Sequence, residues 1–243
     1  MASLIIIPLL IAFFVTLFLV PQWIKRARKM NWLWEDMHKI GHPKNVAGSG
    51  GLIVLLSFIL GVSIYIFIQT FVFNDNSFQI KIFALICSIL IAGMIAIIDD
   101  IFGWKHKGLP KRVRILLLFL AAIPLMIINA GDSTMMGVEF GIIYPLILIP
   151  IGIIGAGATY NFLAGYNGLE ASQGVIILSA LAFVAYQTGN DWLSVIALTM
   201  VASLLAFYLF NKFPAKVFPG DILTYPIGIL IATIAILGNV EKI

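Results

Sequence analysis

The sequence predicts an all-α fold, a polytopic bundle of about eight helices that cross a membrane. Of its 243 residues, 61% are hydrophobic and 11% are charged, whereas soluble domains average about 45–50% apolar and about 25% charged residues. Apolar runs of roughly 20 residues, enough to cross the core of a bilayer, recur along the whole chain. Thirteen of the 15 Lys and Arg residues fall outside these runs.

Eight apolar runs are expected to form the spans. In order, they cover about 3–22, 48–73, 80–98, 113–130, 139–159, 172–187, 192–210 and 222–239. The first run is followed rather than preceded by basic residues, the reverse of a secretory signal, so we interpret it as a span with its N-terminus outside. No soluble domain or internal repeat interrupts the pattern, which predicts a single domain over 1–243.

Connections rich in basic and polar residues alternate along the chain with connections that carry almost no basic residues. Those after spans one, three, five and seven hold most of the basic and polar residues, whereas the others carry Asp75, Asp132 and Asp191. Lys and Arg accumulate in loops that stay in the cytoplasm, so we expect a cytoplasmic active face and both termini outside. The net charge of +4 comes from residues beside spans, which indicates a lipid bilayer as partner and no nucleic acid.

Two adjacent acids, Asp99 and Asp100, directly follow the third apolar run. Neighbouring carboxylates at a helix end repel each other and lose solvation at the membrane edge, and a metal ion or nearby cations would relieve both costs. A solvated helix end is the alternative interpretation.

A third acid, Asp221, opens the last apolar run directly after Gly220. An acid is favourable in the first turn of a helix, and this explains Asp221 alone. It does not explain the polar residues shortly before it, which are Asn211, Lys212 and Lys216.

The segment 161–170 holds two amides and an acid around glycines. Its polar residues are Asn161, Asn167 and Glu170, and its glycines are Gly165 and Gly168. Amides offer both donors and acceptors, as recognition of a nucleobase or sugar requires, and glycine allows close backbone approach. A glycine-rich turn between helices is the alternative.

The first connection combines basic residues with glycines. It contains Asp36, His38, Lys39, His42 and Lys44, followed by Gly48, Gly50 and Gly51. The histidine spacing matches no zinc pattern. Lysines and glycines before a helix suit a phosphate, although the P-loop string is absent.

Together these segments predict Mg²⁺-assisted chemistry on a phosphate-bearing substrate at the membrane edge, with a lipid as second substrate. Two other classes stay open. A transporter for an anionic solute would place polar groups near the middle of the bilayer, and a non-catalytic scaffold would need no such cluster.

The same strings, in this order along the chain, resemble the polyprenyl-phosphate N-acetylhexosamine-1-phosphate transferase family, of the glycosyltransferase family 4 type. The segment 163–170 is similar to the branch that uses UDP-GlcNAc and dolichyl phosphate, and the first connection is similar to archaeal members. The resemblance implies an archaeal plasma-membrane enzyme that transfers GlcNAc-1-phosphate from UDP-GlcNAc to a polyprenyl or dolichyl phosphate. UMP is released, and the reaction would be the first membrane step of N-glycan synthesis.

The resemblance also implies roles for single residues. Asp221 and Asn161 would hold Mg²⁺ or Mn²⁺ with the diphosphate, and Asp99, Asp100 and Asp221 would be catalytic. Substrate contacts are expected from Lys39, Lys44, Lys107, Asn161, Asn167, Gly168, Glu170 and Asn211.

The chain departs from the family pattern at several positions. Gly103 stands where many bacterial relatives have a third acid, and Ala158 where the dolichol-type branch has Asn. Family members have about ten spans, so we expect the last two spans and the final cytoplasmic loop to be lacking, with weak activity if nothing replaces them. Small residues such as Gly152, Gly155 and Gly157 suit helix packing within the chain or in a homodimer.

Overall fold

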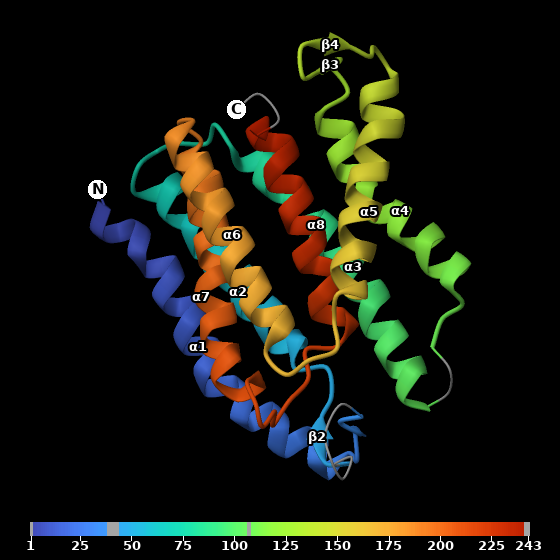
Figure 1. Cartoon of the computed structure of the whole chain (residues 1–243). Coiled ribbons are helices and arrows are strands. Elements are labelled where there is room, and N and C mark those ends of the chain that lie inside the picture. The colour runs from blue at the N-terminus through green and yellow to red at the C-terminus, as the bar shows by residue number, and fades with distance from the viewer. Residues whose placement is uncertain (1, 38–43, 106–107, 241–243) are drawn as a thin grey trace.

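The computed structural model describes residues 2–37, 44–105 and 108–240, and it confirms the all-α bundle (Figure 1). Its helices are α1 (Ala2–Lys29), α2 (Gly51–Phe71), α3 (Gln79–Lys105), α4 (Lys111–Ile128), α5 (Ile149–Phe162), α6 (Leu169–Gln187), α7 (Asp191–Asn211) and α8 (Asp221–Gly238). A π-helical turn, η1 (Tyr144–Leu148), leads into α5.

Two short antiparallel hairpins complete the described structure. Strand β1 (Leu33–Trp34) pairs with β2 (Val46–Ala47), and β3 (Thr134–Met135) pairs with β4 (Val138–Glu139). The first hairpin lies in the connection between α1 and α2, and the second lies between α4 and η1.

Seven helical segments of the described chain are long and apolar enough to cross a membrane, which makes this an integral membrane protein. Helix α4, the fourth expected span, is not among them, because Lys111, Arg112 and Arg114 all lie in its first turns. One of these basic residues, Arg114, lies close to the carboxylates of Asp99 and Asp221.

The two ends of the bundle differ. Figure 1 shows both termini and the β3–β4 hairpin at one end. The connections α1–α2, α5–α6 and α7–α8 lie at the other end, which we call the site end. Which end faces the cytoplasm stays a prediction.

Helix α8 lies in the middle of the bundle, where it contacts α2, α3, α5, α6 and α7. Close packing against α5 depends on Gly228, since a Cβ there would lie 2.4 Å from the carbonyl oxygen of Ala156. Almost every residue of α8 is buried, including Tyr225, which is 1% exposed. The burial of α8 fixes its first residue, Asp221, at the centre of the site end.

Candidate active site

Two connections far apart in the sequence are joined by backbone hydrogen bonds at the site end. The N–H of Phe218 donates to the carbonyl of Ala47 (2.8 Å), and the N–H of Gly50 donates to the carbonyl of Phe218 (2.9 Å). Gly51 donates in the same way to Pro219 (2.9 Å). This ladder holds the start of α8 against the start of α2 and brings both beside α3.

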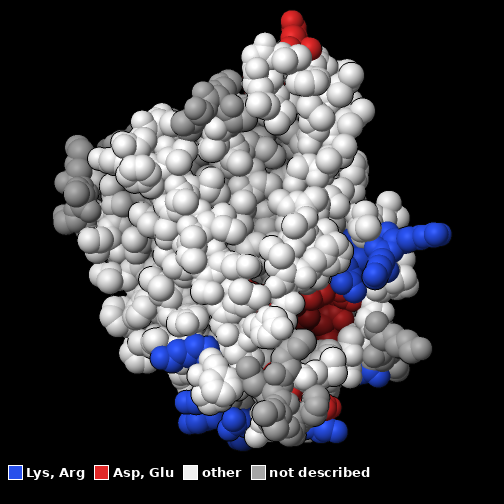
Figure 2. Space-filling view, in the orientation of Figure 1, with Lys and Arg blue, Asp and Glu red and all other residues white. Residues whose placement is uncertain are grey.

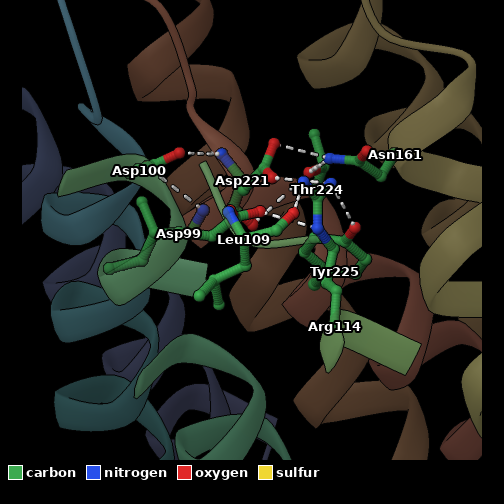
Figure 3. Close-up of polar contacts among 9 residues, drawn as sticks. Asp99, Asp100, Leu109, Arg114, Asn161, Asp221, Thr224 and Tyr225 are labelled. Carbon is green, nitrogen blue, oxygen red and sulfur yellow. Dashed lines mark hydrogen bonds and ion pairs between the residues drawn. The ribbon is translucent and has the colours of Figure 1, made fainter. Parts of the chain in front are cut away.

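Asp100 reaches from α3 to the N-terminus of α8. One oxygen accepts from the backbone N–H of Asp221 (2.8 Å), and the other accepts from the Ser49 hydroxyl (2.7 Å) and the N–H of Ile222 (3.4 Å). A carboxylate that accepts from the first N–H groups of a helix acts as its cap, and here it does so from another helix (Figure 3).

Asp99, on the same turn of α3, is held by α4 and the segment before it. It is 3% exposed and accepts from the N–H of Leu109 (2.6 Å), and Nε of Arg114 lies 2.8 Å from its Oδ2. The prediction that the acid pair follows the end of its helix is therefore wrong, because α3 continues to Lys105. Arg114 is a nearby cation of the kind expected beside the pair, and the burial of Asp99 contradicts the alternative of a solvated helix end.

Arg114 also faces Asp221. Its Nη1 lies 3.5 Å from Oδ2 of Asp221 and donates to the hydroxyl of Tyr225 at 3.1 Å. From the sequence, Arg114 is only one of the basic residues near the start of the fourth apolar run, and no role in the site was predicted for it. Its position one turn inside an apolar helix, where a charge is costly, was the signal that could have found it.

Asn161, in the last turn of α5, completes the cluster. Its side-chain amide donates to Oδ1 of Asp221 (2.7 Å) and to the hydroxyl of Thr224 (2.8 Å). The four residues given metal-binding or catalytic roles by the family resemblance, Asp99, Asp100, Asn161 and Asp221, are thus linked through direct contacts and through Arg114 (Figure 3).

A pocket of about 260 Å³ opens beside this cluster. It is lined by Glu35, Asp36, Met37, Ala164, Gly165, Tyr166, Glu170, Phe218, Pro219, Gly220, Asp221 and Thr224. Figure 2 shows acidic side chains in a hollow towards the site end, with basic side chains next to it. Asp221 is therefore both a member of the buried cluster and part of the pocket wall.

Comparison with known proteins identifies the family. The model of glycosyl transferase family 4 matches residues 82–239, which include α3 from its fourth residue onward and all of α8. The chain belongs to this family.

Its relatives span two branches of glycosyl transferase family 4. A protein of Saccharolobus solfataricus, named as a UDP-N-acetylglucosamine–dolichyl-phosphate N-acetylglucosaminephosphotransferase, is 34% identical over 96% of this chain and 71% of its own length. A phospho-N-acetylmuramoyl-pentapeptide-transferase of Halalkalibacterium halodurans is 29% identical over 97% of this chain and 75% of its own length. That the last two spans of the family are lacking stays a prediction.

The segment 163–170 forms one wall of the pocket in this family member. Gly168 has a φ of +81° and begins α6, and Glu170 in the first turn accepts from the N–H of Gly165 (3.0 Å). The amide of Asn167 donates to Asp36 (3.1 Å), which ties this wall to the first connection. Of these residues, Gly165, Glu170 and Asp36 line the pocket, and Asn167 and Gly168 support its wall.

Of the three lysines predicted to contact substrate, only Lys44 lies in the part of the chain that the structure describes. Lys44 lies near the pocket, with its side chain 76% exposed and its Nζ 3.5 Å from Glu35, a lining residue. Lys39 and Lys107, like His38 and His42, lie outside the described residues.

Asn211 lies away from the pocket, contrary to its expected contact with substrate. It is fully buried, and its amide donates to the carbonyl of Val217 at 2.9 Å. The side chain therefore holds the connection between α7 and α8 in the shape that the backbone ladder requires.

Replacing Asn211 by Ala is expected to destabilise the protein by about 1–3 kcal/mol, because the buried carbonyl of Val217 would lose its donor. A lower melting temperature in detergent checks this. Asn190, a partly exposed amide at the opposite end of α7, provides the control: if Asn190→Ala lowers the melting temperature as much as Asn211→Ala, the anchoring role is wrong.

The donor atoms of the site suit magnesium better than zinc. Within the described ranges there is no group of three or more His, Cys, Asp and Glu side chains placed to hold a metal ion. Asp99 and Asp100 are buried and held by short contacts, which leaves the more exposed carboxylate of Asp221, whose contact with Arg114 is long, and the amide oxygen of Asn161. One or two such oxygens, completed by substrate phosphates and water, are what Mg²⁺ takes in proteins, so the residues fit that ion.

Proposed function

We propose that this protein transfers GlcNAc-1-phosphate from UDP-GlcNAc to a polyprenyl or dolichyl phosphate and releases UMP. Membership of glycosyl transferase family 4 and the printed names of the relatives support the reaction class. The observation that carries the proposal is the Asn161–Asp221 pair, which adjoins the pocket, with Asp221 in its wall.

The lining of the pocket suits the parts of a nucleotide sugar. The diphosphate would lie against Asp221 and Thr224 on α8, where Asp221 and Asn161 would hold Mg²⁺. The lining also offers carboxylate acceptors, Glu170 and Asp36, and an aromatic ring, Phe218. Acceptors and a ring face suit the N–H and O–H groups and the base of a nucleoside.

The reaction joins an oxygen of the lipid phosphate to the β-phosphorus of UDP-GlcNAc. The bond from the β-phosphorus to the bridging oxygen breaks, and the bridging oxygen leaves with UMP. A bound Mg²⁺ supplies neutralisation of the diphosphate charge. Asp100 positions Asp221 through its bond to the N–H of Asp221, and Arg114 holds Asp99.

The location of the site favours a lipid as acceptor. The cluster lies at one end of a membrane bundle, and α4 beside it exposes apolar side chains such as Ile115 and Leu116. We place this end on the cytoplasmic side, since the connections there carry the basic residues. Transport of an anionic solute is less well supported, because transporters place such groups near the bilayer midplane.

Purified protein in detergent or nanodiscs, given UDP-GlcNAc, polyprenyl phosphate and Mg²⁺, is expected to release UMP. Omission of the lipid phosphate or chelation of Mg²⁺ should stop the release, because the acceptor or the charge neutralisation is lost. UMP release that continues at the same rate without lipid phosphate would contradict the proposal. UDP-MurNAc-pentapeptide as donor tests the alternative branch of the family.

A further inference from the structure

One guanidinium serves two carboxylates in the site. Arg114 lies 2.8 Å from Asp99 through Nε and 3.5 Å from Asp221 through Nη1. Its other polar contacts with described residues are neutral: the hydroxyl of Tyr225 (3.1 Å) and the carbonyl of Leu109 (3.4 Å). The guanidinium stays charged at any pH at which the protein folds.

Among the described residues, the charges of the cluster do not balance. The described contacts of Asp100 are with a hydroxyl and backbone N–H groups rather than a cation. Asp99 and Asp221 share the single positive charge of Arg114, and the charge-assisted contact is short with Asp99 and long with Asp221. Since such contacts are strongest when short, Arg114 interacts strongly with Asp99 and only weakly with Asp221.

We propose that Arg114 is an internal counter-cation that competes with the divalent metal ion for Asp221, and so sets the affinity of the site for that ion. The inference rests on the proposed metal site at Asp221. An ion bound there takes over the long contact, while the short contact keeps Arg114 on Asp99. A positive charge fixed this close opposes the binding of a second cation.

Replacing Arg114 changes the affinity for the metal ion, and the direction of this change distinguishes competition from a purely positioning role. If Arg114 only held the carboxylates in place, its loss would loosen the site and weaken metal binding. If Arg114 competes with the ion, its loss removes a repulsive charge and frees Asp99, and metal binding becomes tighter.

The test measures Mn²⁺ binding to the full chain by electron paramagnetic resonance, without substrates, at pH 7. Arg114→Gln is expected to lower the Kd for Mn²⁺ by roughly 10-fold, as expected for the loss of one nearby charge. Arg114→Lys keeps the charge and should stay within about 3-fold of the original protein. Lys111→Gln, a change of an exposed cation three residues earlier on α4, is the control and should have little effect.

An unchanged or higher Kd for Arg114→Gln would overturn the inference, and so would an equal tightening in Lys111→Gln. Arg114→Met is a second neutral variant for the case in which Arg114→Gln fails to fold, and the same outcomes apply to it. Asp221→Asn is measured beside them. If it binds Mn²⁺ as the original protein does, the proposed metal site itself fails; if it loses Mn²⁺ while Arg114→Gln gains nothing, only the role of Arg114 fails.

Discussion

Asp221→Asn is expected to lower lipid-dependent UMP release by about 10³-fold, while the protein still inserts and folds. The change removes the one carboxylate charge of the acid cluster that reaches the pocket wall, and neutralisation of the diphosphate by a metal ion accounts for several kcal/mol of such a barrier. Folding should survive, because Asp100 bonds the backbone N–H of residue 221 rather than its side chain. Initial rates of UMP release at saturating Mg²⁺ check the effect.

Asp191→Asn is the matched control. Asp191 also begins a membrane helix, α7, whose other end, Asn211, leads into the connection at the site end, so Asp191 lies at the opposite end of that helix. Both variants lose an acid from a first helical turn, so both lose the same favourable interaction with the helix dipole. Equal losses of rate in the two variants would mean that Asp221 matters for helix stability and not for the reaction.

Gly220→Ala is expected to lower the same rate by about 10²-fold and to reduce stability. Gly220 has φ +73° and ψ 168°, a conformation that is almost restricted to glycine and costs other residues about 1–3 kcal/mol. A Cβ there would lie 2.3 Å from Oδ2 of Asp100 and 3.0 Å from Cα of Ser49. Because Oδ2 also accepts from the N–H of Ile222 in the first turn of α8, the collision would push Asp100 off the start of that helix. UMP release and the melting temperature check both effects.

The variant Gly189→Ala distinguishes the effect of backbone strain from the effect of the collision with Asp100. Gly189 has a similar φ of +76°, and a Cβ there would meet no atom within 4 Å. This variant should therefore lose some stability and keep its rate. If Gly220→Ala behaves like Gly189→Ala, the contact of Asp100 with the start of α8 is not needed for the reaction.

Most helices were predicted well, because apolar runs of about 20 residues indicate membrane-spanning helices. It predicted α4 less well. The apolar residues of 113–130 look like a span, but Arg114 lies inside that run because Asp99 and Asp221 satisfy its charge. A partner that comes from a distant helix cannot be read from the residues next to Arg114.

The candidate site was predicted as a set of residues but not as a geometry. Polar residues at the ends of apolar runs placed Asp99, Asp100, Asn161 and Asp221 on one face, and the resemblance to the transferase family assigned them to one site. The different roles of the three acids could not be predicted, because they depend on which helix end each carboxylate faces. Asn211 was misjudged for a similar reason: the sequence shows an amide near Asp221, and only the fold shows that its donor is used by Val217.

UDP-GlcNAc that carries radioactive phosphorus at the β position tests the central claim most directly. The label is followed after incubation of the protein with polyprenyl phosphate and Mg²⁺. Transfer of GlcNAc-1-phosphate predicts that the label moves into the lipid fraction, and that Asp221→Asn leaves it in the water-soluble fraction while Asp191→Asn does not. Label that stays with UDP while sugar enters the lipid, or label released as GlcNAc-1-phosphate into water, would contradict the account.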